Sequence, residues 1–330
     1  MRKIPAVLAV SALAALTLAG CAPAGSATSD GCTRSATAES ETLDLITVSG
    51  EFGERPEVKM YTPLVADATE YRDEVAGDGN AIVTPSQSVV LDVTLFDGET
   101  GEELIATAYD GDLSRVAALS QWEQSFPGIA DFLDCATEGS RVVVALPPDG
   151  LTEAQAEQLG LTADQSTVAV VDVRKVYLSK ADGADQFVEG HGLPTVVRAP
   201  DGTPGVIIPD ATPPDDVVVR LLKKGDGEVV TADAPVRIHY TGLTWENPNP
   251  GKPRKPFDSS WERGAPESVS LEGVVEGFAQ ALEGQTVGSQ ILAVIPPDAG
   301  YGDQEQAGIP AGSTLVFVID ILGVDAAPAE

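Results

Sequence analysis

Residues 236–242 read Val236-Arg237-Ile238-His239-Tyr240-Thr241-Gly242, and this stretch decides the fold of the C-terminal part of the chain. Apolar or aromatic residues alternate here with polar ones, which is the period of a β-strand with one buried face. Further β-rich runs occupy residues 217–222, 289–295 and 314–322, with turns containing Gly, Pro or Asp between them. Together these runs predict an antiparallel sheet.

One segment between these strands has helical spacing. Its apolar residues fall on one helical face: Val274, Val275, Phe278, Ala281 and Leu282. Gly284 follows where a C-terminal cap is expected. A single short helix on one face of an antiparallel sheet is an α+β arrangement, and the helix supplies the floor or lid of any pocket.

Short strings recur along the chain in the same order. Gly77-Asp78-Gly79 returns as Gly225-Asp226-Gly227, Leu146-Pro147-Pro148-Asp149 as Ile295-Pro296-Pro297-Asp298, and Ser166-Thr167-Val168 as Ser313-Thr314-Leu315. The separations are 148, 149 and 147 residues, so two copies of one domain follow each other. A further pair, Gly53–Val58 against His191–Val196, predicts that each copy opens with a similar extended segment. The polar stretch Ala181–Gly190 places the boundary near residue 185.

The N-terminus has the layout of an export signal. Arg2 and Lys3 precede the apolar stretch Ile4–Leu18, which is shorter than a membrane-spanning helix. Leu18-Ala19-Gly20-Cys21 then resembles the bacterial lipobox, in which the Cys becomes the new N-terminus and carries acyl chains. The alternative is an ordinary signal peptide with an incidental Cys. We expect an extracytoplasmic protein, lipid-anchored to the cell membrane at Cys21 and followed by a flexible tether.

Composition excludes several classes of partner. The chain has 20 Lys plus Arg against 51 Asp plus Glu, a net charge of −31. Such a surface repels phosphate backbones and anionic headgroups, so we expect no nucleic acid and no membrane contact beyond the lipid anchor. Two His and three Cys are too few for a zinc cluster, and no calcium-binding loop pattern occurs. No metal site is predicted.

Cys32 and Cys135 remain after Cys21 is assigned to the lipid anchor. Outside the cytoplasm an even pair of cysteines is more often bridged than free, so a disulfide is predicted. Two free thiols are the alternative. The bridge would close a loop of about 100 residues, which is worth up to ~4.7 kcal/mol in the chain-entropy model.

Five successive strings resemble the signatures of FKBP-type peptidyl-prolyl cis-trans isomerases. They are Val236–Gly242, Phe257-Asp258-Ser259-Ser260, Val274-Val275-Glu276-Gly277-Phe278, Ile295-Pro296-Pro297-Asp298-Ala299-Gly300-Tyr301-Gly302, and Gly308-Ile309-Pro310 with Ser313-Thr314-Leu315-Val316-Phe317. Their order and spacing match the family over about 105 residues. No single string is decisive, but the combination is highly specific.

The resemblance implies one shallow apolar pocket. Nine residues would form it: Tyr240, Phe257, Asp258, Val274, Val275, Phe278, Tyr301, Ile309 and Phe317. Phe278 would be the aromatic floor under the proline ring, where the family commonly has Trp. Tyr301 and the backbone of Ile309 would hydrogen-bond substrate carbonyls. No cofactor is implied, because rotation of an X-Pro bond needs no nucleophile.

The resemblance also implies that Asp258 pairs with Tyr240 and with Arg263. His239 alternates with the inward positions, so it should face away from the pocket as a structural or solvated residue. Two features depart from the family. Residues 245–256 form a Pro-rich insertion, and Glu267 stands where the family often has a further pocket aromatic.

The implied function is peptidyl-prolyl cis-trans isomerisation of X-Pro bonds in exported proteins. Its expected partners are proline-containing peptide segments and macrolide inhibitors. Two alternatives stay open, a non-catalytic peptide-binding chaperone lipoprotein and a solute-binding lipoprotein. The joint presence of Tyr240, Asp258, Phe278 and Tyr301 favours the enzyme.

The first copy lacks the site. Aligning the copies sets Tyr240 against Val93, Phe278 against Ile129, Tyr301 against Thr152 and Phe317 against Val170, and no Phe-Asp-Ser-Ser string occurs near Leu104. We therefore expect two tandem FKBP-like domains, each a curved antiparallel β-sheet wrapped around one short α-helix. The predicted parts are a signal peptide (1–20), a tether (21–42), a degenerate domain (43–184), a linker with a leading strand (185–216), the catalytic domain (217–324) and a tail (325–330).

Overall fold

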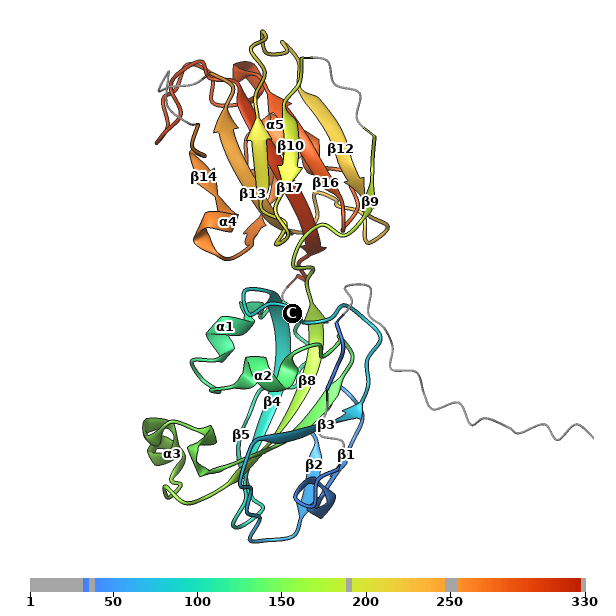
Figure 1. The fold of residues 1–330 in the computed structure, drawn as a ribbon, viewed down its shortest axis with the longest axis vertical. Coiled ribbons are helices and arrows are strands. Elements are labelled where there is room, and N and C mark those ends of the chain that lie inside the picture. Colours follow the sequence, from blue (N-terminus) through green and yellow to red (C-terminus); the bar gives the residue numbers. More distant parts are fainter. Residues whose placement is uncertain (1–31, 36–38, 188–191, 247–253, 328–330) are drawn as a thin grey trace, which may run out of the picture.

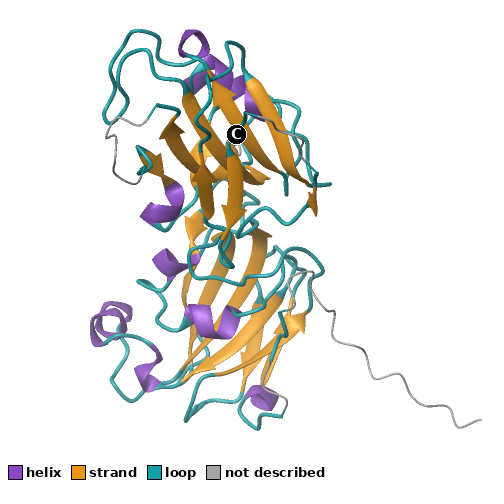
Figure 2. Ribbon diagram, turned by 45° about the horizontal axis from the view of Figure 1, so that its top comes forward, coloured by secondary structure: helices purple, strands orange, loops and turns teal. Residues whose placement is uncertain are grey.

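The computed structural model describes residues 32–35, 39–187, 192–246 and 254–327. They form two sheet-rich units that lie end to end along the long axis of the molecule (Figure 1). Strands dominate both units and the helices are short (Figure 2). Within the described residues, no helix combines the length and the apolar character needed to span a membrane.

The first unit is built on an antiparallel sheet. Its strands lie in the order β3 (Glu70–Val75), β7 (Arg141–Leu146), β8 (Thr167–Val176), β4 (Ser88–Asp97) and β5 (Glu103–Ala106), and β6 (Ala117–Ala118) pairs with β4. Side chains alternate between the two faces of each strand. Val142 and Val144 of β7 therefore pack on the helix side, while Val143 and Ala145 pack under a hairpin of β1 (Ile46–Ser49) and β2 (Glu57–Met60).

The first unit has more helices than the single one expected. They are α1 (Leu119–Trp122), α2 (Ile129–Leu133) and α3 (Glu153–Leu159), with 3₁₀ turns at Leu43–Leu45 and Pro148–Gly150. α3 begins with a capping box, in which the Thr152 side chain accepts a hydrogen bond from the Gln155 N–H and the Gln155 side chain accepts one from the Thr152 N–H. The Thr-x-x-Gln pattern was readable in the sequence, and the prediction of one helix in this copy was wrong.

The second unit repeats this plan. Its sheet has the order β14 (Asp258–Ser259), β13 (Val236–Thr244), β17 (Leu315–Val324), β16 (Gln290–Ile295), β12 (Val218–Lys224) and β9 (Ala184–Asp185), and β15 (Glu267–Val269) also pairs with β13. One face carries α5 (Glu276–Leu282) and the 3₁₀ turns Leu271–Gly273 and Pro297–Ala299, while α4 (Ser260–Arg263) follows β14 at the edge of the sheet. A hairpin of β10 (Thr195–Arg198) and β11 (Pro204–Ile207) contributes Val196 and Val206 to the core on the other face.

The two sheets share a ladder irregularity that fixes how their residues correspond. The pairing of β13 with β17 shifts between Arg237 and Ile238, and that of β4 with β8 shifts between Val90 and Leu91. Ile238 therefore corresponds to Leu91. The same registers set Phe317 against Ala169, not Val170.

That one-residue difference matters because it changes the face of the sheet. Ala169 packs on the helix side of the first sheet, whereas Val170 packs under the hairpin. The predicted counterpart of Phe317 was wrong for this reason. The opening segments also match differently from the prediction, since β1 corresponds to β10 and β2 to β11.

The boundary between the units falls earlier than residue 185. β9 already pairs with β12 of the second sheet, and the Ala181 N–H donates to Asp320 at 2.8 Å. The chain passes from the first unit to the second around Tyr177, which is 1% exposed and packs against Gly323. The Lys175 ammonium donates to the Val324 carbonyl at 2.6 Å, so the last strand of each unit contacts the other.

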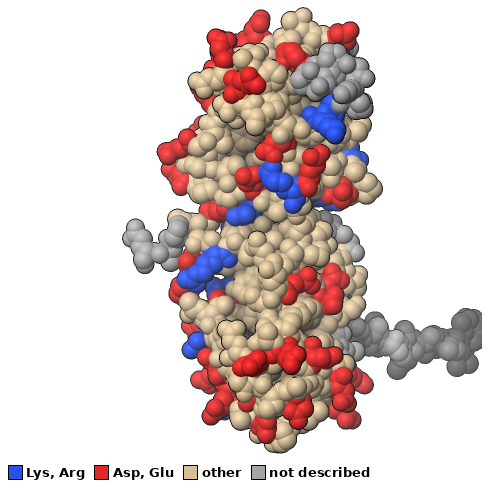
Figure 3. Space-filling view, turned by 90° about the vertical axis from the view of Figure 1, so that its left-hand side faces the viewer, with Lys and Arg blue, Asp and Glu red and all other residues tan. Residues whose placement is uncertain are grey.

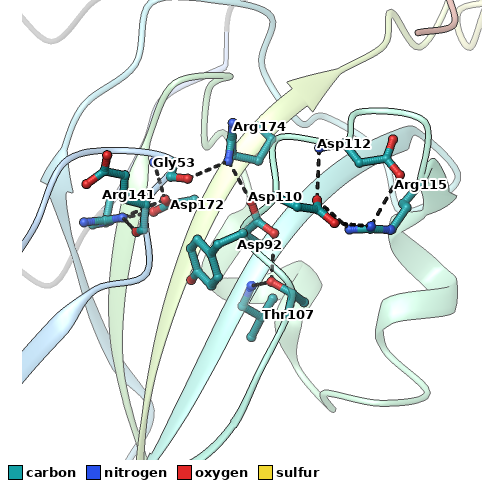
Figure 4. A network of polar contacts seen from close by, with 12 residues as sticks. Gly53, Asp92, Thr107, Asp110, Asp112, Arg115, Arg141, Asp172 and Arg174 are labelled. Carbon is teal, nitrogen blue, oxygen red and sulfur yellow. Dashed lines mark hydrogen bonds and ion pairs between the residues drawn. The ribbon is translucent and has the colours of Figure 1, made fainter. Parts of the chain in front are cut away.

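The first unit holds a buried ion pair (Figure 4). The Arg141 guanidinium and the Asp172 carboxylate are 2.6 Å apart, and their side chains are 1% and 0% exposed. Arg141 also donates to the carbonyls of Gly50, Glu51 and Glu54, which lie in the loop between β1 and β2. The pair thus ties the hairpin to the sheet.

Cys32 and Cys135 are joined by a disulfide, with Cα atoms 5.6 Å apart. Cys135 follows α2 with φ +57°, a left-handed conformation that Gly284, with φ +78°, occupies after α5. The bridge fastens the start of the described chain to the helix side of the first unit. The predicted signal, Cys21 and most of the tether lie outside the described residues.

Candidate active site

The floor of the candidate site is carried by α5. Gly277 lets this helix approach β16 closely, because a Cβ at this position would lie 2.5 Å from the Ile295 side chain. Phe278 is thereby pressed onto the sheet, where it is 5% exposed. Its ring packs edge-on against Phe317, with centroids 4.9 Å apart, and against Tyr240 at 6.3 Å.

A second glycine makes room for the walls. A Cβ at Gly242 would lie 2.7 Å from the Phe257 ring and 2.8 Å from the Phe317 ring. With only hydrogen there, these two rings pack edge to face at 5.6 Å. Aromatic pairs favour such perpendicular geometry because the ring edge is positive and the face negative. The Tyr240-Thr241-Gly242 sequence therefore supplies one aromatic ring and the space for two more.

These rings surround a hollow of about 600 Å³. It is lined by Tyr240, Phe257, Asp258, Glu267, Ser268, Val269, Ser270, Gly273, Val274, Val275, Phe278, Tyr301 and Phe317. Eight of the nine residues predicted from the sequence are in this set. They come from β13, β14, β17, the start of α5 and the turn after β16, so the fold brings together segments up to 77 positions apart.

One edge of the hollow carries a polar network. The Tyr240 hydroxyl donates to Asp258 Oδ2, Arg263 pairs with Asp258, and the Arg263 guanidinium also donates to the Tyr240 oxygen at 3.2 Å. Burial, followed by the hydrogen bond to Asp258, raises the pKa of Tyr240. This tyrosine stays protonated at neutral pH, and Asp258 fixes the direction of its O–H.

Similarity to known proteins identifies the domain that contains this hollow. The family model described as "FKBP-type peptidyl-prolyl cis-trans isomerase" matches residues 227–322. The "Probable FK506-binding protein" of Corynebacterium glutamicum is 32% identical over 119 residues, which are 36% of this chain and 96% of the relative. The chain belongs to the FKBP-type peptidyl-prolyl cis-trans isomerases.

Two further relatives of this isomerase cover a similar share of the chain. The "FK506-binding protein" of Streptomyces anulatus is 34% identical over 125 residues, 37% of this chain and 96% of the relative. The isomerase FkpA of Escherichia coli strain K12 is 36% identical over 112 residues, 34% of this chain and 39% of the relative. Peptidyl-prolyl isomerase activity therefore resides in the second unit.

The isomerase site departs from the sequence prediction at Ile309. Its N–H donates to the Gln306 carbonyl at 2.9 Å, and its own carbonyl accepts from the Gln306 N–H at 3.0 Å. The side chain is 5% exposed and belongs to the core. Both backbone groups are engaged within the turn, so the expected hydrogen bond from this backbone to a substrate carbonyl does not fit the structure.

Val275 offers a backbone donor that the sequence prediction missed. It lines the hollow and precedes α5, and its carbonyl accepts from the N–H groups of Phe278 and Ala279 at 2.9 and 3.1 Å. Its own N–H has no acceptor among the described residues. The first N–H groups of a helix lack intrahelical partners. The sequence pattern extends the helix back through Val274 and Val275, whereas α5 begins at Glu276 and Val275 precedes it in extended conformation. The free N–H of Val275 therefore depends on where the helix begins.

Tyr301 lies in the turn that follows Pro297–Ala299 and is 36% exposed. Its hydroxyl makes no hydrogen bond to any described residue, so it is available to a ligand in the hollow. The turn is held by the Gly302 N–H, which donates to the Pro297 carbonyl at 2.9 Å. Tyr301 thus lines the hollow, and its expected hydrogen bond to a substrate carbonyl stays a prediction.

His239 is buried, with 5% exposure, and it is not solvated. Its ring stacks on Trp261 with centroids 4.0 Å apart, and Nδ1 lies 2.8 Å from the Ser260 hydroxyl. Burial, with a smaller contribution from Arg263, lowers the pKa of His239 to about 4. This neutral imidazole fastens α4 to β13 behind the pocket, which is the structural alternative of the prediction.

Proposed function

We propose that the isomerase accelerates rotation of X-Pro bonds by holding the prolyl ring in the aromatic hollow of the second unit. One observation carries this proposal: Phe278 forms an apolar floor with Tyr240 and Phe317 packed edge-on around it. The prolyl ring has the size and apolar character of such a site. Rotation about the X-Pro bond neither forms nor breaks a covalent bond, so the reaction requires no nucleophile.

The chemistry follows from the polarity of the amide. The barrier to rotation is about 20 kcal/mol, and each 1.4 kcal/mol removed speeds the reaction roughly tenfold. A planar amide is polar through resonance, whereas the twisted amide has lost much of that polarity. An apolar hollow therefore favours the twisted form relative to the planar ones.

Two donors at the hollow would orient the substrate. The Val275 N–H and the Tyr301 hydroxyl both lack partners in the described chain and both line the hollow. Each can bind a carbonyl oxygen beside the rotating bond. Fixing these oxygens while the prolyl ring is held lets the amide rotate between two anchored ends.

We further propose that the first unit is a second FKBP-like domain without isomerase activity. It has the same strand order and the same ladder shift as the second unit. At the corresponding positions it has Val93 for Tyr240, Ile129 for Phe278 and Ala169 for Phe317. The ring of aromatic side chains is therefore missing.

One observation favours peptide binding without catalysis as a second role, in the first unit. A hollow of about 490 Å³ lies on its helix side, lined by apolar residues that include Val93, Ile105 and Trp122. It occupies the place of the isomerase hollow, because Val93 corresponds to Tyr240. This unit would hold an extended apolar segment while the second unit acts on its prolines.

We propose that the protein is lipid-anchored at Cys21 outside the cytoplasm and acts on exported proteins. The signal-like N-terminus and the Leu-Ala-Gly-Cys sequence support this location. The disulfide of Cys32 with Cys135 is consistent with an oxidising compartment. Two relatives are named for binding FK506, and we propose that the aromatic hollow binds this class of macrolide.

A protease-coupled isomerisation assay on a proline-containing peptide tests the catalytic proposal. The full chain should accelerate the slow phase, and Asp258→Val should reduce kcat/KM because Tyr240 and Arg263 lose their shared acceptor. Glu283→Gln, an exposed change at the far end of α5, serves as control and should retain wild-type activity. Absence of any acceleration by the full chain would contradict the proposal.

A further inference from the structure

The edge of the hollow formed by β15 is acidic. Glu267 begins this short strand, pairs with Ile238 of β13 and lines the hollow beside Tyr240. Its carboxylate oxygen lies 3.4 Å from the Tyr240 hydroxyl. Two side chains in the described lining are ionised, and both are carboxylates, Asp258 and Glu267.

Arg263 is the one described cation that pairs with these carboxylates. It forms an ion pair with each of them, so a single positive charge faces two negative ones. One negative charge is left over at the rim. The three side chains are 42 to 48% exposed, so a bound peptide can reach them from solvent.

The surroundings offer little compensating charge. Figure 3 looks onto the side of the molecule that carries α4 and β14, and acidic side chains are spread over this face while basic ones are fewer. The whole chain has 51 acidic and 20 basic residues. A substrate therefore approaches the hollow through a negative potential.

From this geometry, and resting on the proposed function, we propose that Glu267 selects substrates with Lys or Arg beside the proline. The prolyl ring sits among Tyr240, Phe278 and Phe317, so a flanking residue directed toward the Tyr240 hydroxyl passes the two carboxylates. A Lys or Arg side chain there would neutralise the negative charge that Arg263 leaves unbalanced. An acidic flanking residue is repelled.

The experiment compares peptides that differ only in one residue beside the proline, which is Lys, Gln or Glu, placed before the proline in one series and after it in another. Exposed charge pairs contribute modestly, so kcat/KM with the Lys peptide should exceed that with the Glu peptide by about threefold to tenfold at low salt in at least one series. The advantage should shrink in 0.5 M NaCl by screening, to roughly twofold or less.

Three variants assign the effect to Glu267. Glu267→Gln should bring the Lys-to-Glu ratio close to one, and Glu267→Lys should reverse the order. Glu283→Gln makes the same charge change away from the hollow and should keep the wild-type ratio. Equal rates for all peptides in both series, or an unchanged ratio in Glu267→Gln, would overturn the inference while leaving the isomerase function intact. A lack of turnover even with the Gln peptides would overturn the proposed function, and the inference with it.

Discussion

The two units place different partners around the same buried carboxylate. In the first unit Asp172 pairs with Arg141, whereas in the second the corresponding Asp320 accepts hydrogen bonds from Gln290 at 2.6 Å and from the Ala181 N–H at 2.8 Å. Burial raises the pKa of Asp320 to about 6, although both hydrogen bonds act against the shift. The comparison shows that one fold accommodates a buried acid either with a cation or with neutral donors.

The aromatic residues of the site occur in the second unit and have aliphatic counterparts in the first. The second unit concentrates Tyr240, Phe278 and Phe317 on one face, while the first has smaller aliphatic side chains at these positions. The first unit instead has the buried ion pair and the disulfide. We infer that the first unit depends more on the ion pair and the disulfide for its stability, whereas the second unit presents the aromatic site, and each half of this comparison can be tested.

Replacing Arg141 by Gln gives the first unit the residue found in the second. We expect a loss of about 3–5 kcal/mol in unfolding free energy, because a fully buried Asp172 loses its cation. Hydrogen-exchange mass spectrometry should show lost protection in β7 and β8 but not in β16 and β17. The exposed Arg115→Gln is the control, and equal protection in both variants would break the comparison.

Asp320→Asn removes the buried acid of the second unit. The folded-state pKa of Asp320, about 6, is above its ordinary value of 3.8, so its favourable contribution is present below pH 3.8 and is lost as pH rises through 6. Relative to the wild type, the unfolding free energy of the variant should therefore increase by about 2 kcal/mol between pH 4 and pH 7. Urea titrations at several pH values measure this difference. A constant difference across the range would contradict the expected protonation.

Phe278→Ile copies the corresponding residue of the first unit, Ile129. The sheet should remain folded, since an aliphatic side chain still fills the core, but kcat/KM should fall about 10- to 100-fold, equivalent to 1.4–2.7 kcal/mol of lost transition-state stabilisation. The isomerisation assay measures the rate and circular dichroism checks the fold. Wild-type activity in a folded variant would remove Phe278 from the site.

Tyr301→Phe should have the smallest of these effects. One neutral hydrogen bond contributes about 0.5–1.5 kcal/mol, so kcat/KM should fall about twofold to tenfold. The stability should not change, because the hydroxyl makes no bond within the described chain. A fall larger than that of Phe278→Ile would mean that the donor, not the aromatic floor, dominates catalysis.

Local patterns predicted the second unit well. β13, β16 and β17 were located to within one or two residues because period-two alternation survives in the sequence. The start of α5 was placed two residues early, since Val274 and Val275 are apolar at helical spacing but extended in the structure. The pocket residues were predicted from the five strings that resemble the FKBP signatures.

Other features depend on contacts that no local pattern contains. The engagement of the Ile309 backbone by Gln306 is a property of the folded turn. The correspondence of Phe317 with Ala169 depends on loop lengths that differ by one residue between the copies. The ion pair of Glu267 with Arg263 needs the position of α4 relative to β15.

The disulfide would also limit how far a protein anchored at Cys21, as proposed, can reach from a membrane. If the chain is anchored at Cys21, only the eleven residues up to Cys32 can act as a leash, because Cys32 is fastened to Cys135. Fully extended, they span at most about 36–40 Å. Opening the bridge alone would add little to that length, because Arg34 still pairs with Asp73 and donates to the carbonyls of Phe132 and Asp134. The two adjacent fastenings would then hold the first unit of an anchored protein close to the lipid surface, whatever the redox state of the bond.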